Sequence, residues 1–559
     1  MGYAEKNERL NPLTTDLYQL TMSQAFFNEG IANRESAYYL HWRTPAFKNS
    51  SYTTVAGVEE AVDFLKNFKF TNDDIAYLAS QEKKGKKLFA PEFLEFLKKT
   101  PLKLDVETLP EGEVQTTPGP VMMIKGPLYQ CQLVESALLN IINRNSIIAT
   151  KASRIHEATD GAPLAAFGLR RASEIDVSSA RSAFIGGCGV VADVDAGRRL
   201  GIPITGTMAH AFIMNFQEEG KPNVETELTA FKSFLKSMPH NSVLLVDTYD
   251  PKQGVNNAIK AAIEMKVPLD GVRLDSGNIA EIAWYAHKQI SAAKKDHAEL
   301  FSETKIFMTD GLDEQKILKL RKDLDAVSQK EEGKPFPKIL AYGVGTELQN
   351  PGPLRGGVYK VSAHEGAHGM EATMKLAGIN TEDPTLPASK ASIPGMDLDV
   401  MRLWKDGKIV ADIVVDKALG TEKLLQVGNG ISLHDNKAVV NLPAYDKAET
   451  LLKPMFKRNA QGVSEYVFAE PPKKTLIHNG KQVTDLAKIR QFHLDRKAAL
   501  PEAVRAVEST KKPVVLIDPE IQKTRLSIIA KTNAENGKPG TITNGDLQTN
   551  GGPDKQQQI

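Results

Sequence analysis

The sequence predicts a protein of the α/β class, with an α/β barrel in the middle of the chain and an α+β region before it. Between about residues 149 and 360, short apolar runs alternate with segments of helix length. Several of these runs end in small, acidic, basic or imidazole residues, as barrel strands do where their carboxyl ends carry a site. The first third of the chain instead shows strands separated by Pro-Gly turns.

Size and composition are those of a globular protein with more than one domain. A chain of 559 residues is too long to fold around one compact core, so two or more domains are expected. Its 70 basic and 69 acidic residues leave a net charge of +1, which gives no overall field to recruit nucleic acid or an anionic membrane. Cys131 and Cys188 are too few for a disulfide scaffold, and we expect two reduced, buried thiols.

Targeting signals are not evident in the sequence. Residues 1–11 are polar and lack the apolar core of a signal peptide. No apolar run approaches the length of a membrane span. We therefore expect a cytoplasmic protein that binds neither membrane nor nucleic acid.

The first third of the chain combines helices and strands. Residues 15–28 open with helix-capping residue types and carry apolar residues at helical spacing. Three further runs are typical of strands, and a long apolar helix leads out of this region; the runs are 36–43, 102–109 and 121–124, and the helix is 133–150.

The barrel is predicted from seven or so short apolar runs, most of them followed by a helix-length segment. This number favours a closed or nearly closed parallel barrel, while an open, doubly wound sheet is the alternative. The runs are 163–167, 183–185, 203–207, 243–247, 271–274, 305–309 and 339–343.

The periodicity weakens after Lys360, where short strands are predicted that could rejoin the sheet of the first domain; these are 374–376, 400–404, 409–415 and 422–427. From about Asn533 the chain is rich in Gly, Asn and Gln, and we expect a disordered tail. The predicted organisation is an α+β domain (1–148), the barrel (149–365), a carboxy-terminal segment that partly completes the first domain (366–532), and the tail (533–559).

Residues at the predicted strand ends suggest one pocket for a phosphorylated ligand. Gly343-Val344-Gly345-Thr346 follows the last clear strand, where backbone N–H groups commonly hold a phosphate, although such glycines also serve ordinary turns. Alternation along a strand puts Arg273 and Asp275 on one side, either as a structural ion pair or as groups for a phosphate and for a ribose hydroxyl or Mg²⁺. Asp247 and Asp250 could cap the next helix or hold Mg²⁺.

Two further strand ends carry candidate groups. His210 follows the 203–207 run and could be a core histidine or, beside a phosphate, an acceptor of a phosphoryl group. Phe167, Arg170 and Arg171 place an aromatic ring beside two guanidinium groups. This composition suits a flat anionic ligand, because the ring can stack and an arginine can pair with a carboxylate; packed phenylalanine with solvated arginines is the alternative.

Taken together, these segments resemble the nicotinate phosphoribosyltransferase family. The matches run in order from about residue 14 to 361, and the set is specific although no single member is. They are Thr15-Asp16-Leu17-Tyr18-Gln19-Leu20-Thr21-Met22, Pro110-Glu111-Gly112, Phe167-Gly168-Leu169-Arg170-Arg171-Ala172, Gly206-Thr207-Met208-Ala209-His210, Leu245-Val246-Asp247-Thr248-Tyr249-Asp250, Arg273-Leu274-Asp275-Ser276-Gly277 and Gly343-Val344-Gly345-Thr346-Glu347-Leu348.

The resemblance implies a type II phosphoribosyltransferase fold, with a seven-stranded irregular α/β barrel beside an α+β domain assembled from N- and C-terminal segments. It also implies a homodimer with shared active sites and a role in NAD salvage. The implied reaction joins nicotinate to 5-phosphoribosyl 1-diphosphate, giving nicotinate mononucleotide and diphosphate. ATP hydrolysis would be coupled to turnover, which classes the enzyme as a ligase, and Mg²⁺ would hold the diphosphate.

Roles for individual residues follow from the same resemblance. His210 matches the histidine that ATP phosphorylates, and it would act in catalysis with Asp247 and Asp275. Tyr18, supported by Asp16, would reach across the dimer and stack on the pyridine ring opposite Phe167. The other implied substrate-binding residues are Arg170, Arg171, Thr207, Arg273, Ser276, Gly277, Gly343, Gly345 and Thr346.

The sequence departs from the family pattern at two places. After Cys188, relatives usually continue with an acid and a Thr-Ser-Asn cluster, whereas this chain has Gly189-Val190-Val191-Ala192-Asp193. Asn278 replaces the acid that usually closes the Arg-Leu-Asp-Ser-Gly motif. Two alternatives therefore stay open: a nicotinamide phosphoribosyltransferase, for which Asp193 could accept from the amide, and a non-catalytic, nucleotide-binding paralogue.

Overall fold

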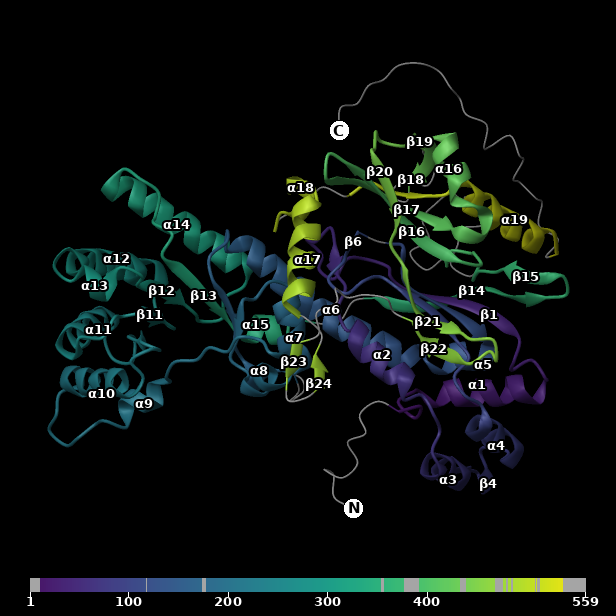
Figure 1. Ribbon diagram of the computed structural model, residues 1–559, viewed down its shortest axis with the longest axis horizontal. Coiled ribbons are helices and arrows are strands. Elements are labelled where there is room, and N and C mark those ends of the chain that lie inside the picture. The colour runs from purple at the N-terminus through teal and green to yellow at the C-terminus, as the bar shows by residue number, and fades with distance from the viewer. Residues whose placement is uncertain are drawn as a thin grey trace.

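The computed structural model describes residues 11–116, 118–172, 177–352, 356–376, 392–432, 439–467, 476–478, 481–483, 486–507, 509 and 513–535. Three larger β-sheets organise this part of the chain (Figure 1). The parallel sheet and its helices lie on the left of the view, and the other two sheets, one antiparallel and one mixed, lie on the right. Residues 533–535 of the predicted tail instead end a helix, and the rest of that tail lies outside the described residues.

A parallel sheet of six strands forms the barrel, in the order β10-β11-β12-β13-β8-β9. A single parallel bridge between Val191 and Ile204 extends it past β9. The parallel sheet curls as an irregular barrel, as expected, but the described residues form six strands where seven were expected. β10 and the Ile204 bridge lie at the two ends of the strand order. The strands are β8 (Leu164–Ala166), β9 (Val190–Val191), β10 (Val243–Leu245), β11 (Gly271–Leu274), β12 (Lys305–Met308) and β13 (Leu340–Val344).

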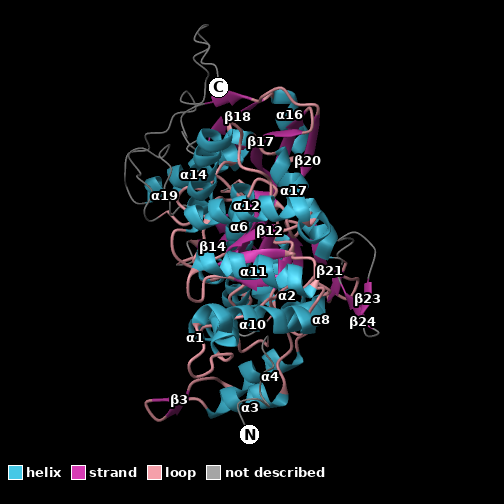
Figure 2. Cartoon of the chain, turned by 90° about the vertical axis from the view of Figure 1, so that its left-hand side faces the viewer, coloured by secondary structure: helices cyan, strands magenta, loops and turns pink. Residues whose placement is uncertain are grey.

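Helices pack against the outer face of this sheet. Figure 2 views the barrel from this side, with α11 and α12 in front of β12. Each larger helix presents buried apolar residues to the sheet and polar residues to solvent. The helices are α7 (Ser178–Ile185), α8 (Val194–Leu200), α9 (His210–Met214), α10 (Asn223–Ser237), α11 (Pro251–Met265), α12 (Ile279–Asp296), α13 (Ala298–Phe301), α14 (Glu314–Glu332) and α15 (Thr346–Gln349).

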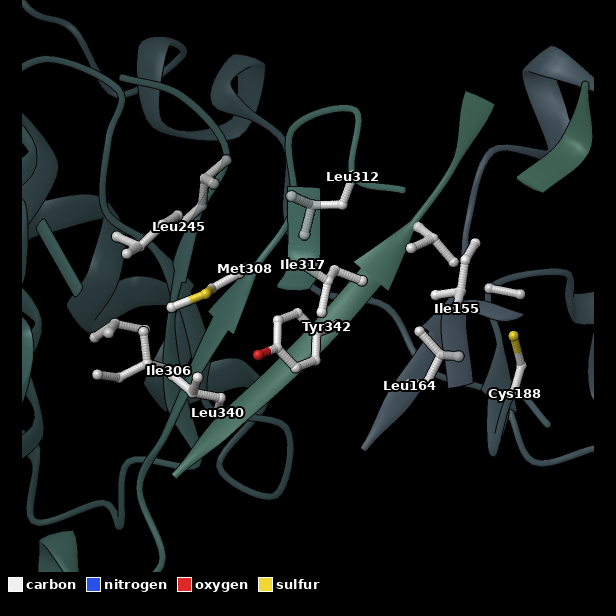
Figure 3. Close-up of a cluster of buried hydrophobic side chains, with 14 of the residues drawn as sticks. Ile155, Leu164, Cys188, Leu245, Ile306, Met308, Leu312, Ile317, Leu340 and Tyr342 are labelled. Carbon is white, nitrogen blue, oxygen red and sulfur yellow. The ribbon is translucent and has the colours of Figure 1, made fainter. Parts of the chain in front are cut away.

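The barrel core lies between the strands and these helices. Figure 3 shows strand residues Ile306, Met308 and Tyr342 on the same side as Ile317 of α14, all members of one buried cluster. Alternate strand residues face the other way, and Ala165, Arg273 and Phe307 line an interior cavity. Leu164 and Tyr342 of the buried cluster also line this cavity, so the packed core borders the candidate site directly.

An antiparallel sheet of seven strands forms the second part of the fold, in the order β15-β14-β1-β7-β5-β21-β22. It combines strands from both ends of the chain: β1 (Glu35–Trp42), β5 (Asp105–Thr108), β7 (Pro120–Pro127), β14 (Gly357–Gly366), β15 (Gly369–Ala372), β21 (Lys453–Arg458) and β22 (Ser464–Tyr466). Its helices are α1 (Leu17–Asn28), α2 (Val58–Lys66), α3 (Asn72–Ser80), α4 (Pro91–Lys99), α5 (Leu128–Leu133) and α6 (Glu135–Ala158).

A third sheet is formed by the carboxy-terminal segment alone, in the order β19-β18-β25-β17-β16-β20. Its strands are β16 (Leu398–Lys405), β17 (Lys408–Asp416), β18 (Asn429–Ser432), β19 (Val439–Asn441), β20 (Lys447–Thr450) and β25 (Val515–Ile517). The helices of this segment are α16 (Thr421–Val427), α17 (Leu486–Ala499), α18 (Glu502–Arg505) and α19 (Pro519–Glu535). Three short antiparallel pairs complete the strands: β2 (Thr53–Thr54) with β6 (Val114–Gln115), β3 (Glu82–Lys83) with β4 (Lys86–Lys87), and β23 (Leu476–His478) with β24 (Lys481–Val483).

A buried ion-pair cluster joins the third sheet to the amino-terminal domain. The guanidinium of Arg402 is 0% exposed and donates to Asp412 on the neighbouring strand (2.7 Å) and to Glu113 (2.5 Å). A buried guanidinium requires such partners, because leaving it unpaired in the interior is strongly unfavourable. The cluster therefore couples the two ends of the chain.

Several strand predictions are wrong. Residues 183–185 lie in helix α7 and residues 422–427 in helix α16, because runs this short carry no period that separates a buried helix from a strand. Residues 203–207 form only the Ile204 bridge, and residues 374–376 form no strand. The strands at 400–404 and 409–415 exist, but they build the third sheet, while β21 and β22 join the first domain's sheet.

The two predicted limits of the barrel domain lie inside secondary-structure elements. Residue 148 lies within helix α6, which connects the amino-terminal domain to the barrel. Strand β14, which contains residue 365, pairs with β1 of the antiparallel sheet.

Cys131 and Cys188 are free and buried. Within the described part of the chain, no helix is long and apolar enough to cross a membrane.

Candidate active site

The candidate site lies at the carboxyl ends of the barrel strands. Asp247 follows β10, Asp275 follows β11, and Phe167 follows β8. Because parallel strands share one direction, the loops that follow them meet at the same end of the barrel. Residues far apart in the sequence are thereby brought together.

Arg273 and Asp275 form an ion pair at the centre of this site. Arg273 Nη2 donates to Asp275 Oδ1 over 2.9 Å, and its Nη1 donates to the carbonyl of Met208 over 3.3 Å. The hydroxyl of Thr309 donates to Asp275 and lies 3.3 Å from Arg273 Nε. Burial acts to raise the pKa of Asp275, but Thr309 and Arg273 outweigh it and the pKa is lowered. Asp275 is therefore ionised at neutral pH.

His210 is the first residue of α9 and lies beside this pair. Its Nε2 is 3.9 Å from Asp275 Oδ2, and its Nδ1 is hydrogen-bonded to the hydroxyl of Thr248 over 3.1 Å. The side chain is 39% exposed, so a ligand can reach the ring. The imidazole is thus held by two neighbours without being enclosed.

Asp247 orders the turn that carries Asp275 and Ser276. Its Oδ2 accepts from the backbone N–H of Asp275 over 2.8 Å and from the hydroxyl of Ser276 over 2.7 Å. Its Oδ1 is buried and has no hydrogen-bond partner among the described residues. Gly277 continues the turn with a φ of 78°, which favours glycine. Asp250 instead caps α11, since its carboxylate accepts from the N–H of Gln253.

A cavity of about 250 Å³ opens beside the ion pair. Phe167, Thr207, Arg273 and Thr309 contribute to its wall. The guanidinium carbon of Arg273 lies 5.8 Å from the centre of the Phe167 ring, within the range of a cation–π contact. A flat aromatic acid could stack on this ring and pair with this cation.

A glycine at the end of β13 allows close packing against Phe167. A Cβ added at Gly343 would lie 2.3 Å from Phe167 Cε2, so only glycine fits there. The N–H of Phe167 donates to the carbonyl of Val344 over 2.7 Å. Gly345 precedes helix α15, and Thr346 is exposed, but neither residue lines the cavity. Their proposed contact with phosphate stays a prediction.

Four predicted substrate-binding residues lie away from the cavity within one chain. Tyr18 is 49% exposed on α1, and the carboxylate of Asp16 accepts from the hydroxyl of Ser136 over 2.6 Å. Arg170 and Arg171 are exposed on a short 3₁₀ helix, Leu169–Arg171. None of the four lines the cavity. Their roles stay predictions that depend on a second subunit or on a bound ligand.

The two positions that depart from the family pattern both cap helices. The carboxylate of Asp193 accepts from the N–H groups of Asp195 and Ala196 at the start of α8. Asn278 accepts from the N–H of Glu281 at the start of α12. Both side chains thus have structural partners.

Sequence reasoning missed three residues that contact the site or its cavity. Thr309 and Thr248 bond to Asp275 and His210. Both follow barrel strands, so the same rule could have found them, but hydroxyls are common at strand ends. Arg490 lines the cavity from helix α17, more than a hundred residues beyond the barrel, and no local signal marks it.

Comparisons with known proteins agree with this geometry. Residues 13–143 match the nicotinate phosphoribosyltransferase (NAPRTase) N-terminal domain, and residues 163–405 match the nicotinate phosphoribosyltransferase (NAPRTase) family. A nicotinate phosphoribosyltransferase of Bacillus subtilis is 33% identical over 460 residues, which cover 81% of this chain and 86% of the relative. One from Caenorhabditis elegans is 28% identical over 458 residues, covering 73% of this chain and 76% of the relative.

Solved structures show the same fold. Human nicotinic acid phosphoribosyltransferase superposes with a TM-score of 0.69 at 23% identity, over 92% of this chain and 100% of that chain. A nicotinate-nucleotide pyrophosphorylase from Pyrococcus furiosus superposes with a TM-score of 0.57 at 22% identity, over 87% of this chain and 95% of that chain. The fold is therefore that of the type II phosphoribosyltransferases, and the chain belongs to the nicotinate phosphoribosyltransferase family.

Proposed function

We propose that this chain joins nicotinate to 5-phosphoribosyl 1-diphosphate, giving nicotinate mononucleotide and diphosphate, in NAD salvage. Turnover would be coupled to ATP hydrolysis through phosphorylation of His210. The observation that carries the proposal is the meeting of His210, Asp275 and Arg273 beside the cavity that Phe167 lines. Family membership supports the two substrates.

In the proposed synthesis step, the chain aligns two reactants and stabilises charge. The pyridine ring would stack on Phe167, and its nitrogen would attack C1 of the ribose as the C1–O bond to diphosphate breaks. Such a step has oxocarbenium character, so the protein contributes by alignment and electrostatics and forms no bond to C1. Arg273, fixed by Asp275 and Thr309, would place its guanidinium close to the stacked ring, because it lies 5.8 Å from the centre of the Phe167 ring.

In the proposed ATP step, a ring nitrogen of His210 attacks the γ-phosphorus. The N–P bond forms as the bond to the ADP oxygen breaks, and water later releases inorganic phosphate. Asp275 beside Nε2 would stabilise the ring as it gains positive charge. The phosphorylated ring would add negative charge next to Arg273, which could shift the position of this guanidinium.

Mg²⁺ fits the carboxylates present, although the described residues contain no group of three or more His, Cys, Asp or Glu that could hold a metal alone. The unpartnered, buried Oδ1 of Asp247 is an oxygen of the kind that Mg²⁺ prefers. Asp247 and Asp275 would hold the ion together with the diphosphate oxygens, and the ion would neutralise the leaving group. One or two carboxylates plus phosphate are a common set for Mg²⁺.

Product analysis tests the proposal. Purified protein is incubated with 5-phosphoribosyl 1-diphosphate, Mg²⁺ and either nicotinate or nicotinamide, with and without ATP, and the mononucleotides are separated. We expect nicotinate mononucleotide, formed faster with ATP. Faster product formation from nicotinamide would favour the related amide enzyme, and no product from either base would favour the non-catalytic paralogue.

His210→Ala tests the coupling separately. We expect this variant to fold normally and to lose ATP stimulation, because no ring nitrogen remains to accept the phosphoryl group. Circular dichroism checks the fold, and rates with and without ATP check the coupling. An unchanged ATP stimulation would contradict the role given to His210.

A further inference from the structure

The cavity beside Phe167 continues to the opposite, amino-terminal end of the barrel. There its wall includes Ala162 and Pro163, which precede β8, together with Gly187, His156 of α6 and Arg490 of α17. Arg490 thus faces the same cavity as Arg273, from a helix of the carboxy-terminal segment. The proposed reaction assigns no role to this end of the cavity.

Arg490 is held at this position by neutral groups only. Its Nε donates to the carbonyl of Cys188 over 3.1 Å, and its Nη2 donates to the carbonyl of Gly187 over 2.9 Å. Its guanidinium carbon lies 5.6 Å from the centre of the Phe184 ring. Within the described ranges, no carboxylate pairs with it, and burial lowers its pKa. Arg490 is partly buried, and a cation that loses part of its hydration without an acid beside it favours a ligand that supplies negative charge.

The neighbouring charges do not compensate for Arg490. Lys497 lies 3.1 Å from Nδ1 of His156 and 3.4 Å from Glu157. Glu157 also pairs with Arg505 over 3.3 Å, so one carboxylate serves two cations. Burial lowers the pKa of His156 to about 3, so this ring is neutral. Glu157 thus serves Lys497 and Arg505, and neither it nor His156 pairs with Arg490.

We propose that Arg490 forms a second subsite in the cavity, for the carboxylate of a small aromatic acid. The remaining wall fits an apolar or aromatic body, since Ala162, Pro163, Leu164, Val243 and Phe307 contribute to it. Nη1 of Arg490 has no partner among the described residues, and it can donate to a carboxylate oxygen while Nε and Nη2 hold the two carbonyls. The subsite does not depend on the proposed reaction.

4-Bromobenzoate is a suitable probe, because it lacks the ring nitrogen that a ribosyl transfer needs and its bromine can be located by anomalous scattering. Crystals of the full chain are soaked with it, and dissociation constants are measured by titration calorimetry in solution. We expect a bromine peak within the cavity near Arg490. Arg490→Gln should weaken binding at this position about tenfold, since a charge-assisted hydrogen bond is lost.

Matched variants separate recognition from loss of structure. Arg505→Gln removes a positive charge at the same end of the barrel but leaves the cavity wall intact, so binding should change less than twofold. Arg490→Lys keeps the cation with fewer donors and should bind with intermediate affinity, which keeps the test usable if Arg490→Gln does not fold. Inorganic phosphate should compete only weakly.

Three results would overturn the subsite. One is a bromine peak confined to the Phe167 and Arg273 end; another is equal weakening by Arg490→Gln and Arg505→Gln, which would indicate a general ionic effect. The third is tighter binding of phosphate than of 4-bromobenzoate at Arg490. None of these measurements depends on catalytic turnover, so they test the subsite independently of the proposed reaction.

Discussion

At the scale of single residues, Asp275 is the group on which the other site residues converge. It pairs with Arg273, accepts from Thr309, lies near His210, and gives its backbone N–H to Asp247. A carboxylate with these neighbours keeps its charge and its position when a ligand arrives. Its role is therefore to hold both the cation and the imidazole.

We expect Asp275→Asn to lower kcat/KM for nicotinate by about 100-fold, because a neutral amide can no longer hold Arg273 as an ion pair or stabilise charge on His210. Steady-state kinetics with ATP present measure this. Asp250→Asn is the matched control, since Asp250 caps α11 outside the network. A loss of similar size in Asp250→Asn would contradict a special role for Asp275.

The residues of the site that sequence reasoning found are those that follow an apolar run and differ chemically from it. His210, Asp247, Arg273 and Asp275 meet this description, and the structure brings them together. Arg490 could not be found in this way, because its place in the cavity depends on how α17 packs against α7. That contact is tertiary and has no local signature.

At the scale of elements, the packing of β13 against the end of β8 determines where the aromatic ring lies. Gly343 leaves room for the Phe167 ring, and the backbone of Val344 accepts from Phe167. Packing against Phe167 therefore requires glycine at position 343, independently of any contact between this loop and a phosphate. A variant that adds a single Cβ at position 343 can separate the packing role of this loop from a phosphate-binding role.

Gly343→Ala is expected to raise KM for nicotinate at least about tenfold, because the new Cβ would lie 2.3 Å from Phe167 Cε2 and must displace the ring. The KM for 5-phosphoribosyl 1-diphosphate should change much less. Gly206→Ala is the control, since a Cβ there meets nothing within 4 Å. Equal changes in both KM values would argue for a general distortion of the loop.

The contact between α10 and α11 contains a buried acid whose titration affects stability. Burial raises the pKa of Glu227 from 4.5 to about 7, with smaller contributions from Asp250 and Asp247. Between these pH values the folded chain keeps a proton that the unfolded chain has lost. The stabilisation that this proton gives is full below pH 4.5 and is lost as pH rises through about 7.

Glu227→Gln cannot ionise, and its amide oxygen can still accept from Asn257, the present partner of Glu227. We expect the variant to be more stable than the unchanged chain above pH 7, by about 2 kcal/mol. Urea unfolding at a series of pH values measures this. Glu225→Gln changes an exposed acid of the same helix and should have no such effect; a parallel gain there would exclude burial as the cause.

The fold class and most strands of the barrel could be predicted because alternation of apolar runs with helices reflects a repeated βα unit. Residues 183–185 and 422–427 could not, since an apolar run of a few residues fits either a strand or a buried helix. Pro203 lacks an N–H to donate, in keeping with the single bridge at Ile204. The pairing of β5 with β21 is also beyond local reasoning, because it joins distant segments.

At the scale of the whole molecule, Tyr18 lies on α1, whereas the cavity is lined mainly by residues of the barrel. Figure 1 shows α1 beside the antiparallel sheet on the right and the barrel strands on the left. This separation is what a dimer with shared active sites would require, since Tyr18 of one subunit would complete the cavity of the other. The prediction can be tested without a structure of the assembly.

Mixtures of two inactive variants provide the test. Tyr18→Ala loses the stacking ring, and His210→Ala loses the phosphoryl acceptor, so each alone should show little ATP-stimulated activity. After random reassembly, half of the dimers contain one of each subunit, and each of these has one complete site. We expect recovery of about a quarter of the activity of the unchanged dimer. Activity equal to the sum of the separate variants would contradict shared sites.

The antiparallel sheet has a consequence for how the protein is made. The barrel occupies one continuous stretch, from β8 to α15, whereas β5, already paired with β7, obtains its second neighbour only when β21 has been translated. A nascent chain emerging from the ribosome therefore carries the open edge of β5 throughout synthesis of the barrel, and such an edge invites pairing with other chains. Newly made molecules should be most prone to aggregate, and most dependent on chaperones, in the interval before β21 appears.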